Sequence, residues 1–414
     1  MNAKEQTNGL KQTELGTLPE DWEVVRLGEV ADISSGGSAP QGEGYFSCRN
    51  PFIRVQHIER KNDRIVKWDL ITDDAVKDYN LKLYPKGTIV FPKSGASIYL
   101  EKRARLPIDA YIVSHLCAVI SNNDKVNQDF LFHGLKNIEL SKDKADGYPT
   151  LNLSEVKNVK IPLPPFPEQK KIAAVLSAVQ EAKEKTEQVI NATKELKKSL
   201  MKHLFTYGAV SVQEAENVPL KETEIGLIPE HWEVVRLGEV FKLTSGKTRP
   251  KNLKQIKYGE FLYPVYGGNG IMGYSDKYLI NYTTIILGRV GEYCGSVHIS
   301  KNKSWVSDNA LYAKEFLYED FDIYFLAASI KMLDLNRLKN IGGQPLISQS
   351  IVYSQSIPLP PLPEQQKIAS ILSAVDEKIQ AEENKKKALE DLFKTLLHNL
   401  MTAKIRVNLL EIPV

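Results

Sequence analysis

The chain contains the same sequence framework twice. Residues 10–37 (LKQTELGTLPEDWEVVRLGEVADISSGG) recur as residues 220–247, with 18 of 28 positions identical. Residues 161–181 (IPLPPFPEQKKIAAVLSAVQE) recur as residues 357–377, with 16 of 21 identical. The first pair is displaced by 210 residues and the second by 196, so the region between the two blocks is 14 residues longer in the first half. A period this long indicates a duplicated unit, each half being a constant frame around a divergent insert, and not a solenoid of short repeats.

A long helix is predicted after each proline-rich block. Pro167 and Pro363 suit the first helical turn, because proline lacks the N–H that would be unsatisfied there. The apolar residues that follow keep heptad spacing, and a heptad seam needs a partner helix. Because the 196-residue offset persists to the helix ends, we predict two helices of equal length that pair as an antiparallel coiled coil. The seam positions are Ile172, Leu176, Val179, Ile190, Leu200 and Leu204 in the first copy, and Ile368, Leu372, Val375, Ile379, Leu389, Phe393, Leu396 and Leu400 in the second.

The inserts, residues 22–160 and 232–356, alternate short β-rich runs with turn residues and a few helical stretches, which is typical of an α+β domain. Trp22 and Trp232 are predicted to anchor the two cores. The expected fold class is therefore α+β, with two similar globular domains separated by a long antiparallel two-helix coiled coil and related by a pseudo-twofold internal repeat. The expected boundaries are 1–20 for an N-terminal tail, 21–160 for the first domain, 161–207 for the first helix, 208–229 for a linker, 230–356 for the second domain, 357–403 for the second helix and 404–414 for a C-terminal tail.

The composition restricts the class of protein. A formal net charge of +3 is only mildly basic, so it permits a nucleic-acid partner without requiring one. Cys48, Cys117 and Cys294 lie far apart, with neither a disulfide framework nor a zinc-binding spacing. The first residues contain no apolar run typical of a signal peptide, and no segment is apolar enough to span a bilayer. These features predict a cytoplasmic protein that does not enter a membrane.

Motifs typical of enzymes are incomplete in this sequence. Gly246-Lys247-Thr248 resembles the end of a phosphate-binding loop, but Phe241 stands where that motif needs glycine. Residues 268–273 match G-x-G-x-x-G, yet Tyr274-Ser275-Asp276 follows and a glycine-rich turn is the better interpretation. Asn50-Pro51-Phe52 lacks the second proline of an adenine methyltransferase site. The sequence therefore predicts no catalytic residue, no metal ligand and a protein that acts by binding.

Several segments closely resemble one known family. The repeated frame PExWEVVRLGEV, the repeated block IPLPPxPEQxKIAxxLSAV and the closing LLHNLMTAKIRV are similar to the specificity subunits of type I restriction–modification systems. Within the inserts, residues 91–104, 263–278 and 286–297 also resemble the target-recognition domains of that family. The resemblance covers nearly the whole chain.

The resemblance implies a division of labour. Each insert would be a target-recognition domain that reads one half of a bipartite, asymmetric site in double-stranded DNA, and the helices would set the spacer. Two modification subunits would dock on the repeated frame and bring S-adenosylmethionine, and restriction subunits would add ATP- and Mg-dependent cleavage. This chain would hold no cofactor itself. The alternatives are a self-contained DNA methyltransferase or nuclease, which the missing motifs disfavour, and a coiled-coil scaffold, which the large β-rich inserts disfavour.

Two sets of residues are candidates for binding. Lys93 and Arg289 align between the inserts on glycine-flanked loops, where a cation can meet a phosphate, and amides such as those of Asn and Gln can read adenine. The repeated Glu-Gln pair at each helix start matches in both halves, which predicts two equivalent docking surfaces for modification subunits. The DNA-binding candidates are Lys93, Ser94, Arg103, Arg105, Lys247, Arg249, Lys251, Arg289, Asn309 and Gln344, and the partner-binding candidates are Glu168, Gln169, Glu364 and Gln365.

Overall fold

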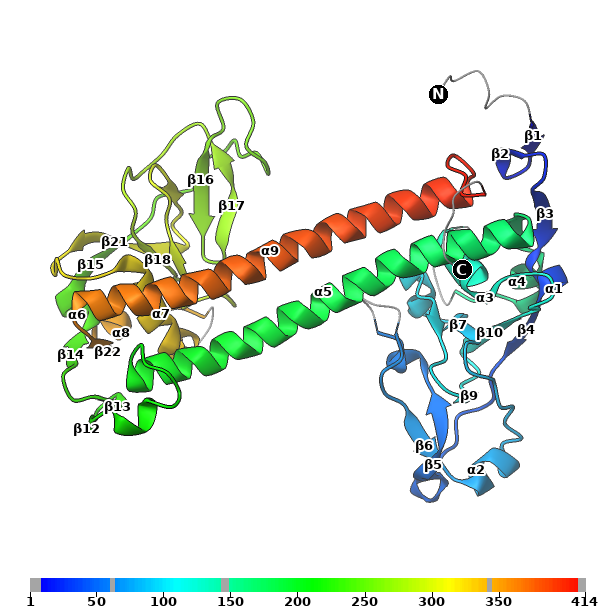
Figure 1. Ribbon diagram of the computed structural model, residues 1–414, viewed down its shortest axis with the longest axis horizontal. Helices are drawn as coiled ribbons and strands as arrows, with labels where there is room; N and C mark the ends of the chain where they lie inside the picture. The colour runs from blue at the N-terminus through cyan, green and yellow to red at the C-terminus, as the bar shows by residue number, and fades with distance from the viewer. Residues whose placement is uncertain (1–8, 60–63, 143–148, 341–344, 409–414) are drawn as a thin grey trace. The chain divides into compact units, whose positions relative to one another are not determined.

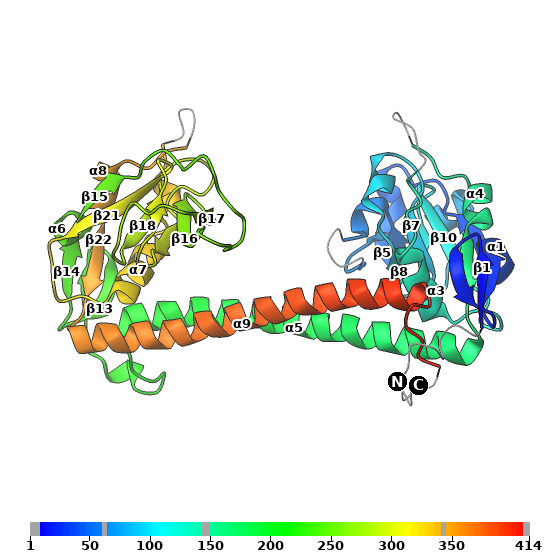
Figure 2. The same cartoon turned by 90° about the horizontal axis from the view of Figure 1, so that it is seen from above.

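A computed structural model describes residues 9–59, 64–142, 149–340 and 345–408. The chain divides into two compact units (Figures 1 and 2). Unit 1 comprises residues 1–186 and 384–414, and unit 2 comprises residues 187–383. Each unit contains one α+β domain and parts of two long helices. Among the described residues, we find no helix with the length and apolar character needed to cross a membrane.

The α+β domain of unit 1 is built on two small sheets. A four-stranded sheet has the order β4-β10-β7-β8, and a three-stranded sheet has the order β6-β5-β9. The strands are β1 (Leu10–Thr13), β2 (Gly16–Pro19), β3 (Glu23–Arg26), β4 (Ala31–Ser35), β5 (Phe46–Ile53), β6 (Asp69–Ile71), β7 (Ile89–Pro92), β8 (Ala104–Arg105), β9 (Tyr111–Ile112), β10 (Leu116–Ser121) and β11 (Lys160–Leu163). The helices are α1 (Leu27–Val30), α2 (Asp73–Asp78), α3 (Gln128–Lys136) and α4 (Leu153–Asn158), with 3-10 turns η1 (Glu43–Tyr45), η2 (Val55–His57) and η3 (Ala96–Leu100).

The α+β domain of unit 2 repeats this order. Its sheets run β15-β21-β18-β19 and β17-β16-β20. The strands are β12 (Leu220–Thr223), β13 (Gly226–Pro229), β14 (Glu233–Arg236), β15 (Phe241–Ser245), β16 (Tyr263–Gly267), β17 (Gly270–Ser275), β18 (Ile285–Gly288), β19 (Val297–Ile299), β20 (Trp305–Val306), β21 (Ala310–Phe316) and β22 (Ser356–Leu359). The helices are α6 (Leu237–Val240), α7 (Ile323–Met332) and α8 (Gln349–Tyr353), with 3-10 turns η4 (Ala215–Asn217) and η5 (Leu335–Leu338). The duplication inferred from the sequence is therefore a duplication of structure.

The repeated sequence blocks pair with one another inside each unit. In unit 1, β3 is antiparallel to β11, and in unit 2 β14 is antiparallel to β22. The first strand of each ribbon directly follows a tryptophan, and Trp22 and Trp232 are both fully buried, as predicted. In unit 2, helix α7 lies between the sheet and the long helices (Figure 2), because Ile330 packs on the sheet core while Phe325 packs with Ile368. Helix α7 thus forms a layer between the sheet of this domain and the long helices.

The two long helices are α5 (Phe166–Tyr207) and α9 (Leu362–Met401). They begin later than the expected 161 and 357, because the intervening residues form the strands β11 and β22 and then a proline pair. They start at the predicted offset, but α5 has 42 residues and α9 has 40. The expectation of equal length is wrong by two residues, since Ala403 adopts a positive φ of 54° just beyond α9 and ends the helical path.

The long helices pair antiparallel within each unit. In unit 2, Lys194 contacts Glu383 at 2.6 Å and Lys197 contacts Asp376 at 2.5 Å, so residue numbers fall along α9 as they rise along α5. The predicted heptad seam is buried at both ends. Its most enclosed residues are Ile172, Leu176, Leu204, Ile368, Leu372 and Leu400. The polar Thr186 also lies buried, with its hydroxyl donating to the carbonyl oxygen of Ala182 at 2.8 Å.

Candidate nucleic-acid interface

Lys93 and Arg289 occupy the same place in their two domains. Each directly follows an inner strand of the four-stranded sheet, β7 or β18. The backbone N–H of Lys93 donates to the carbonyl oxygen of His115 at 2.9 Å, and the N–H of Arg289 donates to that of Asn309, also at 2.9 Å. The two loops are therefore held against equivalent turns by equivalent bonds.

A glycine brings a second loop to each of these turns. A Cβ on Gly36 would lie 2.1 Å from the carbonyl oxygen of Ile112, and a Cβ on Gly246 would lie 2.1 Å from that of Ser307. Only glycine fits such an approach. In the second domain this packing places Lys247 beside the turn that carries Asn309.

The exposed and half-buried side chains at this place in the second domain form what we call the Arg289 face: Ser245, Lys247, Arg249, Arg289 and Asn309. The guanidinium of Arg289 donates to the hydroxyl of Ser245 at 2.9 Å, which fixes its direction. Lys247, Arg249 and Asn309 are exposed. A held guanidinium with an amide and two exposed cations is suited to a polyanion that also presents base edges.

The corresponding Lys93 face of the first domain consists of Lys93, Ser94 and His115. The hydroxyl of Ser94 lies 2.5 Å from Nδ1 of His115 in a hydrogen bond. His115 was not among the residues selected from the sequence. His115 is the first-domain equivalent of Asn309, and this equivalence could be recognised only once the strand pairing was known. The two faces share a backbone scaffold and carry different chemical groups.

A β-hairpin turn borders the Arg289 face. Strands β16 and β17 are joined by Gly268 and Asn269, so the G-x-G-x-x-G segment is a glycine-rich turn, as the sequence analysis preferred. The hydroxyl of Ser296 donates to the carbonyl oxygen of Gly268, and Nε2 of His298 lies 3.2 Å from that hydroxyl. Burial lowers the pKa of His298, so the imidazole packs there without charge near neutral pH. Asn269 is exposed at the tip and is a further amide beside the face.

Two arginines predicted to bind DNA do not belong to the Lys93 face. Arg103 is only 2% exposed, donates to Glu101 at 2.5 Å and lies over the ring of Phe91. It is a buried structural cation. Arg105 pairs with Ile89 at the far end of β7 from Lys93 and is ion-paired with Asp129. Both were selected from the sequence as a basic cluster, and residue type cannot distinguish an exposed cation from a paired one.

Two DNA-binding candidates remain, and the structure describes one of them. Gln344 lies outside the described residues. Lys251 is exposed on the segment that follows the Arg289 face. Among the described residues, no group of three or more His, Cys, Asp or Glu side chains is arranged to hold a metal ion.

Comparison with known proteins identifies the family. The sequence profile described as "Type I restriction modification DNA specificity domain" matches residues 19–195 and 229–391. The chain therefore belongs to the type I restriction–modification DNA specificity family. The predicted resemblance, the non-catalytic class and the duplicated α+β fold with paired long helices are confirmed by this membership and by the relatives below.

Curated relatives match this specificity subunit along nearly its full length. The putative type I restriction enzyme MjaX specificity subunit of Methanocaldococcus jannaschii is 29% identical, with 96% of each chain covered. The MjaVIII specificity subunit of the same organism is 28% identical, with 94% of each covered. The crystal structure of the type I restriction–modification system S subunit from M. genitalium matches with a TM-score of 0.67 at 17% identity, over 96% of this chain and 97% of that one. This structural likeness shows a shared fold.

The residues predicted to dock modification subunits make hydrogen bonds inside the units of this specificity subunit. Glu168 is 3% exposed, and Gln169 and Gln365 are each 1% exposed. The indole N–H of Trp22 donates to Glu168 at 3.0 Å, and that of Trp232 donates to Glu364, also at 3.0 Å. Each of these carboxylates is thus already bonded inside its own unit, and docking of modification subunits at these side chains stays a prediction.

The glutamines complete the attachment. The side-chain oxygen of Gln169 accepts from the N–H of Asn127 at 2.8 Å, and that of Gln365 accepts from the N–H of Asp322 at 2.9 Å. Asn127 and Asp322 are the N-caps of α3 and α7. The Glu-Gln pair is therefore identical in both halves because it fixes the same helix and the same tryptophan in both domains.

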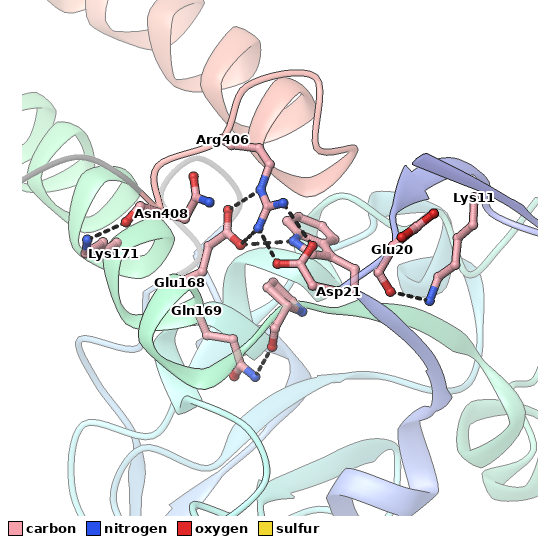
Figure 3. Close-up of polar contacts among 10 residues, drawn as sticks. Lys11, Glu20, Asp21, Glu168, Gln169, Lys171, Arg406 and Asn408 are labelled. Carbon is pink, nitrogen blue, oxygen red and sulfur yellow. Dashed lines mark hydrogen bonds and ion pairs between the residues drawn. The ribbon is translucent and has the colours of Figure 1, made fainter. Parts of the chain in front are cut away.

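The carboxylates have different further partners in the two units. In unit 1, Arg406 donates to Glu168 and also makes two bonds to Asp21, at 2.9 and 2.7 Å (Figure 3). In unit 2, Nε2 of His231 lies 2.9 Å from Glu364. Hydrogen bonding to Arg406 lowers the pKa of Asp21 and these carboxylates raise that of Arg406.

We expect Arg406→Ala to destabilise unit 1 by about 3 kcal/mol, the lower end of the range for removing one partner of a buried ion pair, because Arg406 is 27% exposed. Chemical denaturation of the purified subunit measures the loss. Lys404→Ala, a neighbouring exposed cation, is the matched control and should change stability little. Equal stability of the Arg406 variant and the wild type would contradict the assignment.

Asp21→Asn should show a pH-dependent effect. The pKa of Asp21 is lower in the folded than in the unfolded state, so its contribution is present above the ordinary value near 3.8 and is lost as pH falls through the folded value. The difference in melting temperature between wild type and variant should therefore be present at neutral pH and shrink below about pH 4. A difference independent of pH would indicate that the ionised carboxylate has no role.

Proposed function

We propose that this chain gives a type I restriction–modification complex its DNA specificity, with the Lys93 face binding one half of a bipartite site and the Arg289 face binding the other. One observation carries the proposal. Equivalent backbone bonds hold the two faces at the same place in two copies of one fold, yet the side chains displayed there differ. Domains that read two different sequences from one scaffold need this combination.

The groups on the two faces suit different contacts. Arg289 and Asn309 can make bidentate contacts with guanine and adenine edges, respectively, in the major groove. Ser94 and His115 offer a hydroxyl and an imidazole, which are shorter and less selective. Lys93, Lys247 and Arg249 are suited to phosphates, which position a protein on DNA without reading its sequence.

The partners follow from the repeated frame. Two modification subunits would dock on the duplicated frame and bring S-adenosylmethionine for methyl transfer, and restriction subunits would bring ATP and Mg for cleavage. The chain itself would contribute binding and geometry and no cofactor. Since Glu168, Gln169 and Gln365 are buried, most of the docking surface would lie on other parts of the frame.

Arg289→Ala should weaken DNA binding in a salt-dependent way. Losing one phosphate contact makes the plot of log K against log salt less steep by about 0.9, and losing a base contact adds about 1–3 kcal/mol of lost discrimination. Fluorescence anisotropy of the complex with modification subunits, on its own methylated site, measures both. Lys242→Ala removes an exposed cation from the same domain, one that is paired with Glu315, and is the control. Unchanged affinity at low and high salt would remove Arg289 from the interface.

Inserting one heptad into both α5 and α9, where the two units divide, should lengthen the spacer that the complex accepts. A heptad preserves the apolar seam and adds about 10 Å at 1.5 Å per residue. Along DNA this equals about three base pairs, with a rotation of about 100° that lowers affinity throughout. Mapping methylated adenines across a genome reads the result. Continued methylation of the original site with its original spacer would show that the helices do not set the spacing, and a four-residue insertion, which breaks the seam, is the control.

A further inference from the structure

A basic segment of the second domain extends from the Arg289 face. Residues 247–258 (KTRPKNLKQIKY) contain five cations and no acidic residue. The segment leaves β15 and leads into the β16–β17 hairpin (Figure 1). All five cations are exposed: Lys247, Arg249, Lys251, Lys254 and Lys257. We call residues 247–261 the basic arm.

The basic arm is bonded to the domain at its start and in its middle, and it closes a turn on itself near its end. At its start, the N–H of Lys247 donates to the carbonyl oxygen of Val306 at 3.0 Å, beside the turn of the Arg289 face. In its middle, Lys254 and Tyr274 exchange two backbone bonds at 3.0 and 2.8 Å, which adds the arm to the edge of β17. Near its end, the N–H of Phe261 donates to the carbonyl oxygen of Tyr258 at 3.0 Å and closes a turn. The arm is therefore an ordered extension of the sheet.

Two of its lysines are held over aromatic rings. The ammonium of Lys254 lies 5.6 Å from the ring centre of Phe261, and that of Lys257 lies 5.8 Å from that of Tyr274. A cation over a ring face is attracted by the ring's quadrupole and loses less freedom when it binds a phosphate. These charges are thus partly positioned before any ligand arrives.

The tip of the arm is apolar and uncovered. Ile256 is 72% exposed and Tyr258 is 75% exposed. Large apolar side chains surrounded by lysines suit a ligand that carries negative charge on its outside and apolar sugar and base surface within its grooves. Duplex DNA has this chemistry.

The first domain has a different structure at the equivalent place. Its segment begins at Gly37, whose N–H donates to Ile112 as that of Lys247 donates to Val306, and residues 38–45 (SAPQGEGY) contain no cation. Instead the hydroxyl of Tyr45 donates to Asp78 at 3.0 Å, tying the segment to the acidic helix α2. At this place, cations that could bind a phosphate backbone are present in residues 247–258 of the second domain and absent from residues 38–45 of the first.

We propose that the basic arm grips the DNA backbone next to the half-site read by the Arg289 face, with Ile256 and Tyr258 covered by the groove. This inference rests on the proposed function and adds to it an inequality between the domains. The second domain supplies most of the salt-dependent affinity, and the first contributes mainly through direct contacts of the Lys93 face.

The test uses the full chain in complex with its modification subunits and a duplex containing the site that the complex methylates. The variant Lys251→Gln/Lys254→Gln/Lys257→Gln removes three charges from the arm. The control Lys77→Gln/Lys82→Gln/Lys86→Gln removes three exposed charges from the first domain. Affinity is measured by fluorescence anisotropy between about 50 and 200 mM salt, the range over which phosphate contacts are most visible.

We expect the arm variant to make the plot of log K against log salt less steep by about 2–3, since each phosphate contact contributes about 0.9. The control should leave the slope near that of the wild type, and the arm variant should methylate the same sequence. An unchanged slope in the arm variant would overturn the inference, as would an altered methylated sequence, because the arm would then read bases.

Tyr258→Ala tests the apolar tip. Covering a tyrosine side chain contributes about 1.5–3 kcal/mol, so its removal should weaken binding by about 10- to 100-fold at every salt concentration. Tyr258→Phe, which keeps the ring, should bind like the wild type. Wild-type affinity in Tyr258→Ala would contradict the covered tip. If the wild-type complex binds no specific site, the proposed function itself fails. If the wild type binds its site and the arm variants bind with unchanged affinity and salt slope, the inference alone fails.

Discussion

Each long helix is fixed to a domain at its first turn by a carboxylate, buried in unit 1 and half-buried in unit 2, and by a buried amide. Glu168 and Glu364 each accept the indole N–H of a fully buried tryptophan. Gln169 and Gln365 accept the backbone N–H of the N-cap residues of α3 and α7. A buried polar group left without its partner costs about 1–3 kcal/mol, so the two bonds tolerate little variation in direction. The orientation of each domain on its helix is set there, and the sheet transmits that orientation to the loops after β7 and β18.

This attachment separates what must stay constant from what can vary. The strands β3 and β11, the tryptophan and the helix start form one packed block, and in unit 2 β14 and β22 do the same. The loops after β7 and β18 are held mainly by backbone bonds, which do not depend on side-chain identity. A loop fixed in this way can exchange Lys93 for Arg289, or His115 for Asn309, without loss of its position. The fold thus permits new side chains at the faces with little cost in stability.

The sequence predicted those features that depend on period and repetition. The duplication, with Trp22 and Trp232 at matching positions, follows from the repeated sequence blocks. The paired helices follow from heptad spacing, because burial repeats at fixed intervals along a helix. Features that depend on three-dimensional contact could not be read in the same way. The Glu-Gln pair looked like a partner surface because identity in both halves has two causes, and the sequence cannot distinguish an internal bond from an external one. Arg103 and Lys93 are both cations, but only the strand pairing shows that Arg103 is buried over Phe91. The position of His115 next to the loop after β7 could be recognised only from the pairing of β10 with β7.

The two structural units do not correspond one to one to the two repeats of the sequence. The core of unit 1 includes Leu400, Met401 and Val407, which come from the end of the chain's second helix and beyond. The core of unit 2 includes Leu204 and Phe205, from the end of the first helix. Each domain is therefore completed by the helix that starts on the other domain, and neither half of the sequence contains a whole unit. A change in the length of one helix alone moves the residues that close the opposite core, so the two helices are constrained to change together. The near-constant 196-residue offset between them is the sequence record of that constraint.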